Sequence, residues 1–195
     1  MPTAESTKLE AVNTMLAAIA HLPVNTLGSG TALAASQAEA VLDEVDREVQ
    51  LEGWVFNRER DVQLTPNVDD EIELPVNILR IDASSPSLDV VEREGKLYDK
   101  KNHTFTFAGA VRVDVTYFLE FDDLPEDARR YMTVRAARIF VDRVMGSTAR
   151  HRYTMDDERV ARATMIRYNA EVRDTTIFSG FAAGRVLARL NPFLR

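Results

Sequence analysis

The sequence predicts an α+β protein: a four-helix body, with two N-terminal and two C-terminal helices, carries an inserted antiparallel β lobe and a C-terminal docking tail. Apolar residues recur every three or four positions near both ends of the chain, as along one face of a helix. In the middle they alternate with polar residues, as in strands with one face turned inward. This order favours one helical bundle with a lobe inserted in it. We expect a body of residues 1–53 and 122–174, a lobe of 54–121 and a C-terminal segment of 175–195.

Two helices are predicted before the lobe. Thr7 and Glu10 have the spacing of a capping box, which satisfies free amides at a helix start. Leu22-Pro23 ends the first helix, because the residue before a proline avoids the helical conformation. The second helix is expected over about residues 32–52. Gly53 follows it, and glycine suits the left-handed conformation with which many helices end.

Gly53, Trp54 and Phe56 mark the expected joint between the body and the lobe. Trp54 is the only tryptophan of the chain, and this side chain buries a large contact area. The aromatic and β-branched residues from Trp54 to Phe56 suit the start of a strand. We interpret these residues as a structural joint at which Trp54 fastens the lobe to the helices.

The lobe is predicted from β-favouring runs that are separated by turn residues. Its clearest strand alternates apolar and polar side chains from Val111 to Phe121. A hairpin is expected to turn near Gly95, and Pro75 favours a bend or an edge strand where it interrupts an apolar run. The other predicted β segments are residues 56–64, 72–81, 90–98 and 104–107.

Two further helices are predicted after the lobe. Pro125 lies among acidic residues and predicts a helix start, since proline and acids are favoured in a first turn. This third helix should run to about Met145 and end at Gly146. Thr154 is the expected cap of the fourth helix. The predicted buried side of the fourth helix consists of Val160, Ala163, Thr164, Tyr168 and Val172.

The net charge of −7 conceals an asymmetry along the chain. Residues 128–195 contain 14 Lys and Arg against 6 Asp and Glu, whereas residues 1–127 carry a net charge of −15. Two interpretations stay open: two solvated surfaces of opposite sign, or the basic end of one copy meeting the acidic end of another copy or an acidic partner. Salt bridges between subunits explain the arginines of the last two helices better than nucleic-acid binding, because no reader motif with stacking aromatics surrounds them.

The C-terminal segment carries the candidate interface residues. A single soluble domain rarely leaves a large apolar stretch in water. Packing back on its own domain is one explanation, and docking onto another subunit is the one we favour. The candidate residues are Phe178, Phe181, Arg185, Leu187, Leu190 and Phe193.

No sequence pattern indicates a catalytic residue, a cofactor or a bound metal. The chain has no cysteine, and its three histidines lack a metal-ligand spacing. The acidic clusters at residues 122–123 and 156–158 are explained as helix starts, where carboxylates favour the helix dipole. No stretch approaches the ~20 apolar residues that a membrane span needs.

Three stretches resemble the tail tubular protein A family, the head-to-tail adaptors of short-tailed bacteriophages. They are residues 9–27, the helix that runs into Gly53-Trp54-Val55-Phe56-Asn57, and residues 121–146. Because their order and spacing and the total length match as well, the resemblance covers about residues 8–175.

The resemblance implies a structural virion protein that is not an enzyme. Such adaptors form a ring of twelve copies beneath the portal protein, attach the tail nozzle (a tail tubular protein B-like partner) and help to anchor tail fibres. Genomic DNA passes through the channel without sequence-specific binding. The chain would assemble in the cytoplasm of the bacterial host, and its C-terminal segment would contact a subunit or the portal. Two alternatives stay open: a tail-associated carbohydrate hydrolase with a carboxylate pair, and a nucleic-acid-binding regulator.

Overall fold

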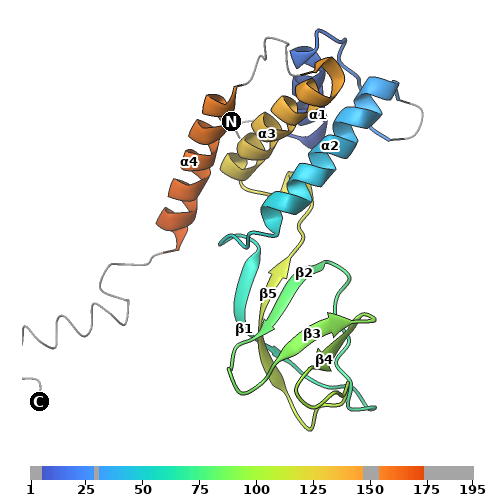
Figure 1. Cartoon of the computed structure of the whole chain (residues 1–195), viewed down its shortest axis with the longest axis vertical. Coiled ribbons are helices and arrows are strands. Elements are labelled where there is room, and N and C mark those ends of the chain that lie inside the picture. Colours follow the sequence, from blue (N-terminus) through green and yellow to red (C-terminus); the bar gives the residue numbers. More distant parts are fainter. Residues whose placement is uncertain (1–5, 29–30, 147–153, 174–195) are drawn as a thin grey trace, which may run out of the picture.

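The computed structural model describes residues 6–28, 31–146 and 154–173, and it confirms the predicted α+β fold (Figure 1). In this part of the chain, the helices gather at one end and the strands form a lobe at the other. The helices are α1 (Lys8–Ala18), α2 (Leu33–Gln50), α3 (Glu126–Met145) and α4 (Met155–Val172). The strands are β1 (Arg58–Leu64), β2 (Ile78–Ala83), β3 (Val90–Arg93), β4 (Lys96–Asp99) and β5 (Val111–Tyr117). A 3-10 helix at Phe121–Asp123 leads from the lobe back into α3.

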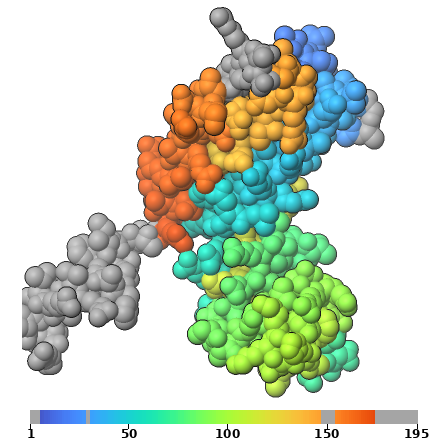
Figure 2. All heavy atoms as spheres, viewed as in Figure 1, coloured from blue at the N-terminus to red at the C-terminus, as the bar shows by residue number. Residues whose placement is uncertain are grey.

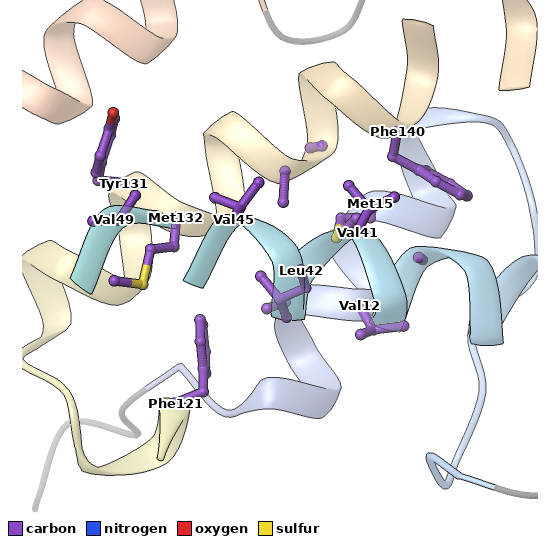
Figure 3. Packing of buried hydrophobic residues seen from close by; sticks show 14 of the residues in the cluster. Val12, Met15, Val41, Leu42, Val45, Val49, Phe121, Tyr131, Met132 and Phe140 are labelled. Atoms are coloured by element: carbon purple, nitrogen blue, oxygen red, sulfur yellow. The ribbon is translucent and has the colours of Figure 1, made fainter. Parts of the chain in front are cut away.

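The helical body is built around α3, which contacts each of the other three helices. Apolar side chains from α1, α2 and α3 fill the space between them (Figure 3). Burying one such side chain stabilises a fold by roughly 1.5–3 kcal/mol, so this core is the main force that holds the three helices together. Its buried members include Val12, Leu42, Val45, Met132 and Phe140.

The local helix signals are confirmed where the sequence predicts them. Thr7 and Glu10 form a complete capping box at the start of α1. Thr154 caps α4 and forms a second capping box with Asp157. Gly146 follows α3 with a φ of 79°, in the left-handed region that favours glycine.

Helix α4 lies at the edge of the body and packs on α3 (Figure 1). Its predicted buried side is wrong. Met165 is the buried residue of this helix, and Thr164 and Tyr168 are half-buried. The face against α3 also includes Glu158, which accepts a hydrogen bond from Arg138 Nε at 2.6 Å. Apolar periodicity does not identify a packing face that contains a charged residue. The predicted residues that are exposed are Val160 (68%), Val172 (51%) and Ala163.

The lobe combines a three-stranded sheet with a two-stranded hairpin. Strand β5 lies between β1 and β2 and pairs antiparallel with both. Strands β3 and β4 form the predicted hairpin, which turns at Glu94 and Gly95, both with positive φ. The alternation predicted for β5 is confirmed, because Val111, Val113 and Val115 are buried in the core of the lobe.

Two segments are shorter than predicted. Helix α1 ends at Ala18 rather than at Leu22, and the side chain of Asn13 exchanges two hydrogen bonds with the backbone of Val24. This contact brings the following loop back along the helix. Strand β5 ends at Tyr117 rather than at Phe121, because the backbone groups of Leu119 bond to a side chain of α2 instead of to a strand.

Other predicted β segments are irregular. Residues 54–57 form a turn, in which the Trp54 carbonyl accepts from the amides of Asn57 and Arg58. Residues 104–107 contribute only single bridges, from Thr104 and Thr106. Residues 71–73 do the same, and β2 begins at residue 78, beyond the proline that was expected to cause a bend.

Candidate functional site

Two amide side chains tie α2 to the segment that returns from the lobe. Gln50 donates from Nε2 to the Leu119 carbonyl at 2.8 Å and accepts at Oε1 from the Leu119 amide at 2.9 Å. Asn57 donates from Nδ2 to the carbonyls of Gln50 and Tyr117, both at 2.9 Å, and accepts from the Trp54 amide. Both side chains are buried, so their donors and acceptors have little competition from water. We call Gln50 and Asn57 the amide clamp.

The residues predicted to form the joint lie beside the amide clamp. Trp54 is 7% exposed in the helical core and donates from Nε1 to the Val49 carbonyl at 2.8 Å. Gly53 has a φ of 76°, and a Cβ at this position would approach Thr116 Oγ1 to 3.3 Å. Phe56 is half-buried against the same core. The structure places Trp54 on the helical side of the joint, and the role of these three residues stays a prediction.

The amide clamp was not predicted from the sequence. One signal was present: Asp46 and Gln50 stand one turn apart among the buried apolar residues of α2. Buried polar groups need hydrogen-bond partners, so this pair indicates a hydrogen-bonding group from another part of the chain. The partner of Gln50 lies 69 residues away, and no local pattern reveals it.

Asp46 is a buried carboxyl next to the amide clamp. It is 2% exposed and accepts a hydrogen bond from Gln50 Nε2 at 2.8 Å. Burial raises the pKa of this carboxyl to about 6, although the hydrogen bond from Gln50 opposes the shift. Among the surrounding charges, Lys8 favours the ionised form, whereas Asp43 and Glu120 disfavour it. A carboxyl with a pKa of about 6 therefore lies beside the joint.

Three ion pairs join the α2 side of the body to α3 and α4. They use carboxylates from the acidic part of the chain and arginines from its basic part, so this share of the charge asymmetry is compensated within one chain. Salt bridges between subunits stay a prediction for the arginines of α3 and α4. The pairs are Glu44 with Arg143 (2.6 Å), Glu48 with Arg135 (2.7 Å) and Glu52 with Arg162 (2.8 Å).

The acidic clusters make structural contacts. Asp122 accepts from the Lys8 amide at 2.7 Å, and Asp157 completes the cap of α4. Within the described ranges, no group of three or more His, Cys, Asp or Glu residues is arranged to hold a metal ion. None of the four described helices is long and apolar enough to cross a membrane.

The candidate interface residues of the C-terminal segment fall outside the described residues. They are Phe178, Phe181, Arg185, Leu187, Leu190 and Phe193.

The polar side chains described above hold elements of the chain together. A family model described as "Tail tubular protein" matches residues 9–175. The chain is also 29% identical over 178 residues to "Tail tubular protein A" of Klebsiella phage KP34. The aligned residues cover 90% of this chain and 94% of that protein. The chain therefore belongs to the tail tubular protein family and is a structural protein of a phage tail.

Proposed function

We propose that the chain is the head-to-tail adaptor of its virion, a ring of twelve copies between the portal protein and the tail nozzle. The nozzle partner would be similar to tail tubular protein B, and tail fibres would attach at the side. The observation that carries this proposal is the family match, which extends over residues 9–175 and so includes the helical body, the joint and the lobe.

The fold supports a protein that joins different neighbours. The body and the lobe each have their own core. The amide clamp fixes the end of α2 against the segment that follows β5, so the two parts present their surfaces in a defined relation. A ring in which each copy contacts two neighbours and two different axial partners needs several such surfaces.

The acidic composition supports a role in the DNA ejection channel. A wall that carries carboxylates repels phosphate, so DNA would slide past it without sequence-specific binding. The N-terminal 127 residues, with their net charge of −15, supply the carboxylates. Replacing channel-facing acids by neutral residues should then slow ejection or impair the retention of packaged DNA. Unchanged retention and ejection would remove this part of the proposal.

Binding to portal rings tests the adaptor role directly. Purified chain is mixed with portal rings of the same phage, and the mass of the complex is measured. The expected result is a complex with one ring of twelve copies on each portal ring. If the folded chain does not bind intact portal rings, the adaptor role is wrong. In the described residues, nothing favours the carbohydrate hydrolase or the nucleic-acid-binding regulator over this function.

A further inference from the structure

A pocket between the helical body and the lobe is lined by cationic side chains, and we call it the arginine pocket. Its volume is about 350 Å³, and its charged lining comes from Arg58 and Arg60 of β1 and from Arg173, which directly follows α4. Trp54 and Val55 add apolar lining. In Figure 2 the orange-red end of α4 lies next to the teal residues that begin the lobe. Among the described residues no carboxylate lines the pocket, so its chemistry suits an acidic group.

Two of the three arginines have no counterion in the described part of the chain. Arg58 is paired with Asp114 of the neighbouring strand at 3.2 Å. The side chains of Arg60 and Arg173 form neither a hydrogen bond nor an ion pair within the described residues. The residues that follow Arg173 have the same sign of charge as the pocket, since residues 174–195 contain three arginines and one aspartate. We therefore expect the compensating carboxylates to come from a partner.

The lobe carries a turn of complementary composition, residues 67–70, which we call the acidic turn. Val68 is 98% exposed and is followed by Asp69 and Asp70, which are both exposed. Asn67 holds the turn in shape, because its Oδ1 accepts from the Asp69 amide at 3.0 Å. Among the described residues, Asp69 and Asp70 are the only two consecutive carboxylates of which neither accepts a hydrogen bond or forms an ion pair. The acidic turn therefore offers two free carboxylates beside an exposed apolar side chain.

The acidic turn lies too far from the arginine pocket of its own chain to enter it. Arg58 begins β1, whereas the turn follows Leu64 at the end of this strand, and the strand spans roughly 20 Å. The carbonyl of Asp70 accepts from the Phe107 amide at 2.8 Å, and Phe107 is buried in the core of the lobe, which fixes the turn at this distance. In Figure 1 the segment after β1 lies at the end of the lobe that is turned away from the body. A contact between turn and pocket therefore joins two copies.

We propose that the arginine pocket of one copy receives the acidic turn of a neighbouring copy. The carboxylates of the turn meet Arg60 and Arg173, and Val68 covers the apolar lining. The inference rests on the proposed ring and assigns a contact that links one copy to the next. Pocket and turn are different surfaces, so the contact is of the head-to-tail type, which closes into a ring when the rotation allows it. Because rotation about one axis keeps equivalent residues at one height, β1 runs around the ring rather than along its axis.

The phosphate backbone of DNA is the alternative occupant, since arginine binds phosphate and carboxylate alike. A cationic pocket on the channel wall would hold the phosphates that have to pass during ejection. The proposed channel therefore favours a pocket that faces a neighbouring copy, and its carboxylates as the ligand.

Charge reversal in the purified chain, mixed with portal rings, tests the contact. The pocket variant carries Arg60→Glu and Arg173→Glu. The turn variant carries Asp69→Arg and Asp70→Asn, because Asp70 has a φ of 59° and asparagine tolerates this conformation. Each variant should need at least about tenfold more chain to fill the portal rings, since the opposite charges across the contact are lost. A chain that carries both sets should fill them nearly as well as the parent, because opposite charges meet again.

A matched control reverses a charge elsewhere on the same helix. Arg159 is 73% exposed and lies roughly 21 Å from Arg173 along α4, so Arg159→Glu should fill the portal rings like the parent. All variants should keep the circular dichroism spectrum of the parent, because the replaced side chains of pocket and turn make no hydrogen bond or ion pair in the described part of the chain. The neutral variants Arg60→Gln and Asp69→Asn repeat the test if a reversed chain does not fold, and each should still weaken filling.

Three outcomes overturn the inference. The first is a folded pocket or turn variant that fills portal rings like the parent. The second is a combined chain that fills them no better than the weaker of its two parts. The third is a pocket variant that forms the ring normally but loses packaged DNA, which would identify phosphate as the occupant. If the parent chain itself does not bind portal rings, the proposed function fails, so the two failures are distinguishable.

Discussion

Replacing Asp46 by asparagine should stabilise the protein at neutral pH and remove part of its dependence on pH. The folded protein raises the pKa of this carboxyl to about 6, whereas an exposed aspartate has a pKa near 3.9. The folded state therefore binds a proton more tightly than the unfolded state. Between about pH 4 and pH 6 the contribution of Asp46 to the free energy of unfolding falls as the pH rises, and above that window this contribution has been lost.

The size of the effect follows from the pKa difference. A difference of about two pKa units corresponds to about 3 kcal/mol. At pH 7.5 the buried carboxyl is ionised, and this lowers the free energy of unfolding by that amount. The substituted asparagine would keep an oxygen that accepts from Gln50, but it also buries amide hydrogens, which costs about 1–2 kcal/mol. We therefore expect a net gain of about 1–2 kcal/mol at pH 7.5. At pH 4.5, where Asp46 is largely protonated, the gain should vanish or change sign.

Urea denaturation at both pH values, followed by the fluorescence of the single, buried Trp54, measures this effect. Asp69→Asn serves as a control, because this aspartate of the lobe is exposed and the same charge is removed without burial. The reasoning is refuted if Asp46→Asn is less stable than the parent at pH 7.5 while matching it at pH 4.5. That result would mean that the fold stabilises the ionised form.

Further substitutions at three positions test the joint and the edge helix, each by urea or thermal unfolding followed by circular dichroism. Trp54→Ala should cost about 3–5 kcal/mol, since a large side chain leaves the helical core; a loss below about 1 kcal/mol would contradict its burial. Asn57→Ala should cost about 1–3 kcal/mol, because the carbonyls of Gln50 and Tyr117 each lose a donor and the Trp54 amide loses an acceptor, and an unchanged midpoint would show that Asn57 contributes nothing. Thr154→Ala should cost about 1 kcal/mol and Thr154→Ser much less, and equal losses would argue against the cap.

The features that sequence predicts well here are local. A capping box needs two residues three positions apart, so Thr7 with Glu10 and Thr154 with Asp157 could be found without knowing the fold. The left-handed turn at Gly53 is of the same kind. The overall α+β order also follows from local periodicity, because helices and strands have different repeats.

The features that sequence missed depend on distant partners. The packing face of α4 contains Glu158, whose charge is compensated by Arg138 of α3, so periodicity pointed to Val160 instead. The amide clamp depends on backbone groups of Tyr117 and Leu119, which follow the lobe in the sequence and lie 60 and 69 residues away from their partners. The limits of body, lobe and C-terminal segment as domains stay predictions.

Imaging of intact particles tests the adaptor role most directly. The chain carries a bound label, and the tails are averaged around their axis. We expect a closed ring of twelve labelled copies between the portal and the nozzle, with DNA in its channel. A label that is found along the fibres, at the distal end of the nozzle or in a structure without a closed ring would contradict it.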